Sequence, residues 1–231
     1  MQNYDEQILR SRMLNPQAPY PLVHQAVRIA LFDEYAARSF YARVVEGFGA
    51  RAPFSNILAS EERHIEALSN LCTRLGIARP LDPFPAETTL EPTWLANCNR
   101  AIAGEIANIR LYGQLLTTVA EPDVRQVFLN LQAASYEQHL PAFREAALSA
   151  LEQERYHAAM GIPPQQAYVK HGPFSDLLER ALAQMVGRGG VLGLVSPLLR
   201  NSHPALLSGL VVGGAGVYLL KKKTGLGRKE S

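Results

Sequence analysis

Hydrophobic positions recur at steps of three and four residues over most of the chain, as they do on the buried face of an α-helix. The first such stretch begins at Val23 and is stopped by Gly47 and Gly49. A second begins at Pro53, a residue that suits the first turn of a helix, and ends before Gly76. The pattern therefore predicts two long helices in the first third of the chain.

Two further helical stretches follow a connection rich in proline. Residues 77–91 contain three prolines and predict a crossover without an element of its own. Pro92 opens a third helix, and residues 121–123 open a fourth, whose acidic first turn suits the helix dipole. The fourth continues toward Met160 with an interruption at Pro141. Since no alternating strand pattern occurs in this region, the sequence predicts an all-α fold.

The four helices form two similar pairs. The first and third each place a tyrosine seven residues after a glutamate, which is two turns along the same helical face. The second and fourth each contain Ala-Ser followed by a histidine four residues after the serine. The residues concerned are Glu34 with Tyr41, Glu105 with Tyr112, His64 and His139.

The second helix carries the clearest metal-binding pattern. Glu61 and His64 are three residues apart, about 60° around a helix, and so lie on one side of it. Helical bundles use this Glu-x-x-His step to bring an oxygen and an imidazole to one metal ion. Glu34 and Glu105 lie on otherwise apolar faces, and His139 would complete a second half of the site. Carboxylates would balance the four positive charges of two divalent ions in a dry interior.

The segments FDEYAARSFY, APFSNILASEERH and ASYEQHLPAF resemble the ferritin-like di-iron carboxylate superfamily over about residues 23–155. They are most similar to a bacterial ferritin-like or rubrerythrin-like branch without an assigned activity. The resemblance implies a four-helix bundle that holds two iron ions per chain. It implies oxidation of Fe(II) by O2 or peroxide, in iron storage or as a peroxidase-like oxidoreductase. Carried over to this sequence, the iron ligands are Glu34, Glu61, His64, Glu105 and His139.

One position departs from the superfamily pattern, because Tyr136 stands where the fourth helix would carry a glutamate. Tyr136 could ligate iron as a phenolate, or lie beside a looser site that holds only one iron firmly, or mark a vestigial site. Glu137 lies about 200° from His139 on a regular helix, nearly on the opposite face. Only a local bulge near Pro141 would bring Glu137 into the site.

Other candidate residues have simpler interpretations. Tyr41 and Tyr112 are core aromatics with a hydroxyl partner, or they contact the metal ligands and donate electrons to the centre. Cys72 and Cys98 lack metal-site spacing and are expected to be buried, reduced thiols. No Cys-x-x-Cys pair for a rubredoxin-type centre is present. Four histidines have no motif around them and stay unassigned: His24, His157, His171 and His203.

Charge divides the 231 residues into unlike parts, although the whole chain carries only +2. Through residue 166 there are 14 arginines, no lysine and 18 acids, for a net charge of −4. Residues 167–231 contain 9 basic and 3 acidic residues, for a net +6, with 11 of the 17 glycines. We therefore expect an N-terminal arm over 1–22, a bundle over 23–166 and a basic, Gly-rich, hydrophobic helical tail over 167–231.

The tail predicts an association with a membrane through residues 190–223. Pro204 to Leu220 are 17 uncharged residues, at the lower limit for a membrane span. A shallow hairpin keeps the following lysines on the cytoplasmic side, where they would favour anionic lipid. The N-terminus has no secretory signal, which places the expected bundle in the cytoplasm, at the inner membrane. The alternatives are packing on the bundle, a contact within a homo-oligomer, or a docking peptide for a shell compartment.

Two functions follow from these observations. The first is a membrane-tethered enzyme that oxidises Fe(II) at the site described above. The second is a non-catalytic bundle with a degenerate site, acting as a membrane or compartment adaptor in iron handling. A nucleic-acid partner is not expected, because the basic residues lack interleaved aromatics or a known binding module.

Overall fold

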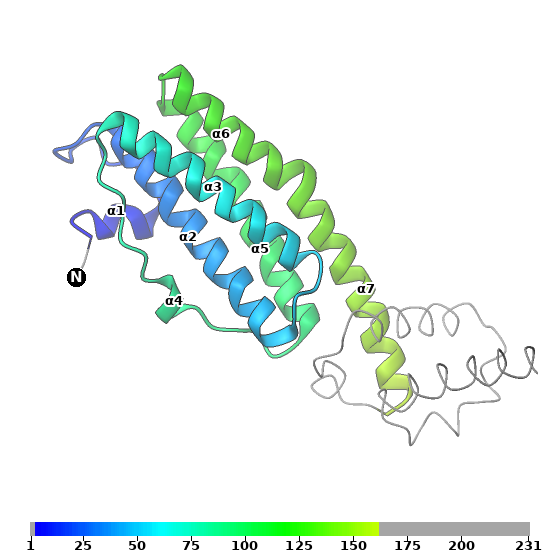
Figure 1. Cartoon of the computed structure of the whole chain (residues 1–231). Helices are drawn as coiled ribbons and strands as arrows, with labels where there is room; N and C mark the ends of the chain where they lie inside the picture. Colours follow the sequence, from blue (N-terminus) through cyan, green and yellow to red (C-terminus); the bar gives the residue numbers. More distant parts are fainter. Residues whose placement is uncertain (1–2, 162–231) are drawn as a thin grey trace, which may run out of the picture. The chain divides into compact units, whose positions relative to one another are not determined.

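The computed structural model describes residues 3–161, and in this part of the chain every regular element is a helix. The prediction of an all-α protein is therefore confirmed. The helices and their bounds, labelled in Figure 1 where there is room, are α1 (Glu6–Ser11), α2 (Leu22–Phe48), α3 (Phe54–Leu75), α4 (Phe84–Glu87), α5 (Trp94–Thr118), α6 (Pro122–Ala134), the π-turn η1 (Ser135–His139) and α7 (Leu140–Ala159).

Local sequence explains where the long helices begin and end. Helix α3 ends at Gly76, whose left-handed backbone, with φ of 65°, directs its N–H to the carbonyls of Cys72 and Thr73. Helix α5 begins at Trp94 rather than at Pro92. Its N-terminus is set by Thr93, whose hydroxyl accepts a hydrogen bond of 3.1 Å from the Ala96 N–H.

Helices α2, α3, α5 and α6 bury their apolar faces against one another. Figure 1 shows the four lying side by side. One shared core contains Leu31 from α2, Leu68 from α3, Tyr112 from α5 and Phe128 from α6, each fully buried. Burying a side chain of this size contributes about 1.5–3 kcal/mol, so this common core holds the four helices together.

The connection between α3 and α5 runs back along α2 toward the C-terminal end of that helix (Figure 1). The Phe84 ring packs on Phe32 of α2, with 4.7 Å between ring centroids, and the Arg43 side chain donates a 3.0 Å bond to the Pro85 carbonyl. The connection contains the short helix α4, which the hydrophobic pattern did not predict. Asp82 accepts a 3.1 Å bond from the Phe84 N–H at its start.

Helices α6 and α7 are joined without a break by η1. In this wide turn the Leu140 N–H bonds to the carbonyl of Ser135, five residues earlier. Pro141 follows directly and has no N–H to donate to the preceding turn. The interruption that we expected at Pro141 is thus a widened turn just before it, with helix on both sides.

The N-terminal arm is attached to α2 by a buried ion pair. Arg28 donates two bonds to the Asp5 carboxylate, of 2.7 and 2.6 Å, and the two side chains are only 2% and 0% exposed. The Tyr4 ring lies 4.2 Å from the same guanidinium. The arm also contains α1, which the hydrophobic pattern did not predict.

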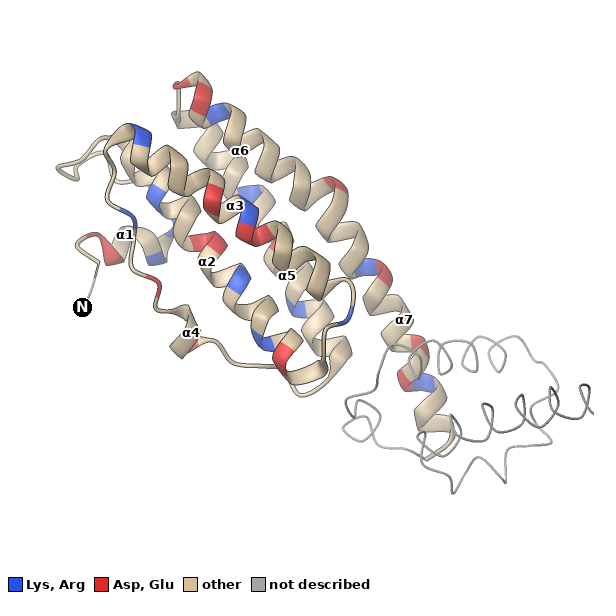
Figure 2. Ribbon diagram, viewed as in Figure 1, with Lys and Arg blue, Asp and Glu red and all other residues tan. Residues whose placement is uncertain are grey.

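Charged residues of both signs are spread along the helices, as Figure 2 shows. Among the described helices, none combines the length and the apolar character needed to cross a bilayer. The predicted tail over 167–231, its membrane-associated part over 190–223 and the boundary near residue 166 lie outside the described residues.

The Asp5–Arg28 pair gives a test of how the arm is held. We expect Asp5→Ala to lower the free energy of unfolding by about 3 kcal/mol, because it leaves a buried guanidinium without its carboxylate. Urea denaturation followed by circular dichroism measures the change. Glu87→Ala is the matched control, since Glu87 pairs with Arg10 at the surface, and it should cost less than about 1 kcal/mol. Equal losses in the two variants would contradict the buried pair's role.

Candidate metal centre

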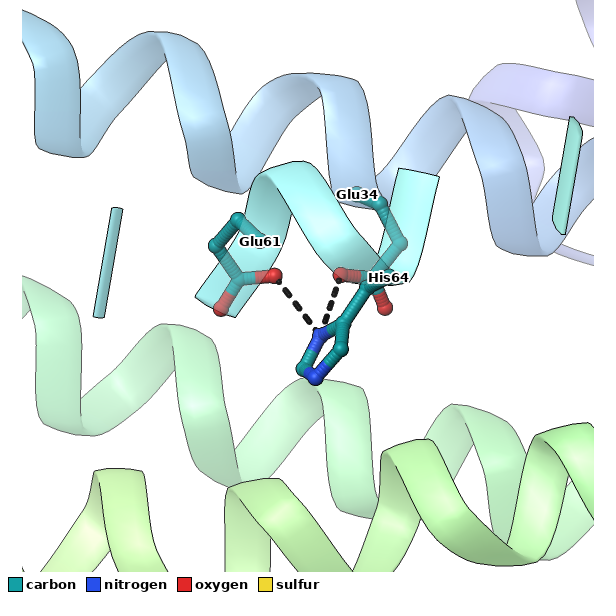
Figure 3. A group of neighbouring side chains, drawn as sticks. All are labelled: Glu34, Glu61 and His64. Carbon is teal, nitrogen blue, oxygen red and sulfur yellow. Dashed lines mark hydrogen bonds and ion pairs between the residues drawn. The ribbon is translucent and has the colours of Figure 1, made fainter. Parts of the chain in front are cut away.

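The first group of candidate ligands joins α2 to α3. His64 directs its Nδ1 toward two carboxylates, 3.1 Å from Glu61 Oε2 and 3.3 Å from Glu34 Oε2 (Figure 3). All three residues are buried, and one donor atom of each lies within 4.8 Å of the others. This is the kind of group that could hold a metal ion.

A second group shares Glu61 with the first. His139 Nδ1 lies 3.3 Å from Glu61 Oε1 and 3.5 Å from Glu105 Oε1. The three donor atoms again lie within 4.8 Å of one another, and all three residues are buried. Glu61 therefore directs one oxygen toward His64 and the other toward His139. The two imidazole rings are stacked, with 5.5 Å between their centroids.

Two tyrosines bond the two carboxylates that the groups do not share, Glu34 and Glu105, which are called the outer carboxylates below, and each bond crosses from one helix to the other. Tyr41 of α2 donates a 2.6 Å hydrogen bond to Glu105 of α5, and Tyr112 of α5 donates one of 2.6 Å to Glu34 of α2. Each tyrosine lies seven residues after the glutamate of its own helix but bonds the glutamate of the other. This exchange requires α2 and α5 to run antiparallel. It also gives each carboxylate a fixed orientation.

Further polar residues, none of them among the predicted site residues, complete the arrangement. Asn108 donates to Glu34 Oε1 at 3.3 Å and to Asp33 Oδ2 at 3.4 Å, and accepts a 3.2 Å bond from the Ser135 hydroxyl. Arg12 in turn pairs with the other oxygen of Asp33. Two spacings could have indicated them: Asn108 lies three residues after Glu105, and Ser135 precedes His139 by four.

The π-turn decides which residues of the fourth long segment face inward. Ser135 and His139 are buried, whereas Tyr136 is 64% exposed and Glu137 is exposed too. A turn of more than 3.6 residues moves residues three apart further from a common face than a regular helix does. The five predicted ligands thus come together in the interior, and Tyr136 does not join them. A bulge is present near Pro141, but Glu137 stays outside.

Electrostatics show how the carboxylates coexist in the interior. Burial and the neighbouring Glu61 charge raise the pKa of Glu34 to about 7. Burial opposes ionisation of Glu61 as well, but its interactions with Glu34, His139 and His64 outweigh burial and lower the pKa of Glu61. Glu34 and Glu61 overcome the effect of burial on His64 and raise its pKa to about 10. Glu105 and Glu61 do the same for His139 and raise its pKa to about 9. Protonated imidazoles therefore balance the carboxylates when no metal ion does.

The donor set fits a divalent transition metal. Carboxylate oxygens and imidazole nitrogens bind Fe(II), Mn(II) and Zn(II), so these residues do not by themselves select iron. His139 Nδ1 is buried, and no group among the described residues forms an aligned hydrogen bond with it. Its contacts with Glu61 and Glu105 are ion pairs. A nitrogen in that position is suited to coordinate a metal ion.

A pocket of about 280 Å³ between α2 and α5 reaches one side of the two groups. Glu61 and Glu105 line it, together with Asn108 and Tyr41. Arg12 and Arg100 also line the pocket. The candidate centre is thus accessible to a small molecule although all of its ligands are buried.

No protein-family model, curated protein or solved structure matches this chain. The geometry of the described residues is therefore the basis for the function proposed below.

The raised and lowered pKa values predict how the stability of metal-free protein depends on pH. The folded state favours neutral Glu34 and protonated His64 and His139, so their contributions are lost as pH rises through about 7 and then through 9–10. The pKa of Glu61 is lowered in the folded state, so its carboxylate adds stability at pH values above its pKa in the unfolded chain. This contribution is lost in acid. We therefore expect unfolding temperatures in excess chelator to decline steadily from pH 6 to pH 10.

The matched variant for this measurement is His64→Gln, which removes one of the titrating imidazoles. Its unfolding temperature should fall less steeply than that of the original chain between pH 8 and pH 10. Stability that rises over this interval in the unaltered chain would contradict the protonated state of the two imidazoles.

Proposed function

We propose that this chain is a ferritin-like protein whose four-helix bundle binds two iron ions and oxidises Fe(II) with O2 or peroxide. The observation that carries the proposal is the position of Glu61, whose two oxygens face two separate groups of carboxylate and imidazole donors. A carboxylate shared in this way suits a pair of metal ions, because it neutralises part of both charges at once.

The proposed roles follow from the two groups. Glu34 and His64 would hold one ion, Glu105 and His139 the other, and Glu61 would bridge them. When bound, two Fe(II) ions supply two electrons, which suffice to reduce peroxide to water or O2 to peroxide. Tyr41 and Tyr112 would keep the outer carboxylates in place through their hydrogen bonds.

Charge makes this centre unusual for its proposed class. Three carboxylates face the four positive charges of two divalent ions, which leaves a net +1 where the superfamily pattern would have a fourth carboxylate. The exposed position of Tyr136 supports a version of the proposal without a phenolate ligand. The cytoplasmic location and the membrane tether belong to the same proposal, and the tether depends on residues 190–223, outside the described residues.

Metal content tests the proposal directly. We expect the purified full-length chain, loaded anaerobically with Fe(II) and then desalted, to retain two irons per chain. Glu61→Ala should retain fewer than half an iron, because it removes a donor from both groups. Glu105→Ala should retain about one. Elemental analysis gives the counts, and the ferric absorbance after admission of air gives the rate of oxidation.

Glu62→Ala is the matched control for this experiment. Glu62 is the exposed neighbour of Glu61 on the same helix, so its loss should leave both irons in place. Fewer than half an iron in the unaltered chain, unchanged in Glu61→Ala, would overturn the proposal and favour the non-catalytic adaptor. If the chain binds two irons but does not oxidise them with air or peroxide, the proposed metal site stands and the proposed activity does not.

The tyrosine bonds generate a separate prediction about affinity. Tyr112→Phe removes the hydrogen bond to Glu34 and should weaken metal binding by about 10–100-fold, as loss of a group that orients a ligand does. Competition between the protein and a coloured chelator for Co(II) measures the change. Tyr35→Phe is the control, since Tyr35 is only half-buried on the same α2 helix and is not one of the two tyrosines bonded to these carboxylates. Equal affinity in the two variants would show that the bond has no such role.

A further inference from the structure

The pocket between α2 and α5 approaches the candidate centre from its carboxylate side. Glu61 and Glu105 form part of its lining, whereas neither imidazole does. Its volume of about 280 Å³ lies just below the usual range for ligand pockets. A molecule bound here would lie against Glu61, the proposed bridging ligand, and against Glu105. The volume limits such a molecule to a few carbon atoms or one ring.

Small residues on both helices create the space. Ala36 and Ala37 of α2 face Ala101 and Gly104 of α5 across the pocket. Gly104 lies at the solvent-exposed edge of the pocket, and a Cβ atom added to it would have no other atom within 4 Å. The aliphatic side chains of these walls suit the carbon body of an organic ligand better than a hydrated inorganic ion.

Two arginines line this pocket, each paired with one carboxylate. Arg12 pairs with Asp33 through Nη2. Arg100 uses Nη1 to bond the Thr89 carbonyl at 2.8 Å and Glu91 at 3.3 Å, and its guanidinium lies 4.2 Å from the Phe40 ring centroid. A guanidinium has five N–H donors, so these bonds leave further donors for a ligand. Carboxylates are the groups that such a fork binds best among small organic anions.

Charge within the centre favours an anion too. In the function proposed above, three carboxylates leave an excess of +1 against two divalent ions, while Asp33 offsets the charge of Arg12 and Glu91 offsets that of Arg100. We propose that the pocket binds a small organic carboxylate beside Glu105, recognised by Arg100 and enclosed by the small residues of α2 and α5. This inference rests on the proposed function, because the excess positive charge requires bound metal. The carboxylate supplies the negative charge that the protein lacks.

Benzoate is a suitable probe because one ring with a carboxylate matches the size and the chemistry of the pocket. The full-length protein is loaded with Co(II), the cobalt is counted, and benzoate is titrated while heat and the visible Co(II) spectrum are recorded. We expect saturable binding of one benzoate per chain with a change in the spectrum. Benzamide, of the same shape without the charge, should bind at least tenfold more weakly.

Two substitutions separate the pocket from adventitious binding to the metal. Gly104→Leu fills the open space and should weaken benzoate binding at least tenfold, and Arg100→Gln should weaken it about tenfold. Ala103→Leu and Arg110→Gln are the matched controls, because both residues are exposed on α5 and neither lines the pocket. Both controls should bind benzoate like the unaltered chain, and cobalt counts and melting temperatures establish that each variant is folded and loaded.

The outcomes distinguish this inference from the proposed function. Fewer than half a cobalt per chain in the unaltered protein would overturn both. With two cobalt ions bound per chain, absence of saturable benzoate binding would overturn the carboxylate pocket alone. The same holds if Gly104→Leu and Arg100→Gln, folded and loaded, bind benzoate as tightly as their controls.

Discussion

The burial of three carboxylates at one place in the interior is the constraint on which the rest of the structure depends. Glu34, Glu61 and Glu105 are each at most 2% exposed, and a carboxylate removed from water is costly unless charge and hydrogen bonds compensate it. The two imidazoles supply the charge, and the tyrosine hydroxyls supply short hydrogen bonds. Metal ions would supply the same compensation more strongly, which is why an arrangement costly for stability is suited to metal binding.

The path of the chain makes this compensation possible. The connection through α4 returns along α2, and α5 consequently runs antiparallel to α2. Only in that orientation does the tyrosine of each helix reach the glutamate of the other. The same pairing of α2 with α5, with alanine and glycine between them, leaves the pocket that reaches Glu61 and Glu105. The connection therefore positions both the ligands and the access to them.

Much of the candidate centre could be predicted from local spacing. Glu61 and His64 share a face because residues three apart always do so on a regular helix. The repeated Glu–Tyr and Ser–His spacings pointed to the equivalent residues of the other helices. Tyr136 was harder to interpret, because a regular helix would bring it within 60° of His139. The π-turn rotates Tyr136 outward, and Ser135 takes the inward position. The widened turn lies directly before Pro141, but the position of the proline does not say which residues the turn directs inward.

By itself the sequence predicted the all-α fold and the approximate limits of the long helices, because helical periodicity is a local property, and its spacings and family resemblance pointed to the five candidate ligands. Tertiary structure alone decided that Glu61 is shared by two groups, that each tyrosine bonds the opposite helix and that Asn108 and Ser135 join the arrangement. It also decided that a pocket with two arginines reaches the carboxylates. The reason is that these features depend on the direction and spacing of helices far apart in the chain, which the common core and the α3–α5 connection set.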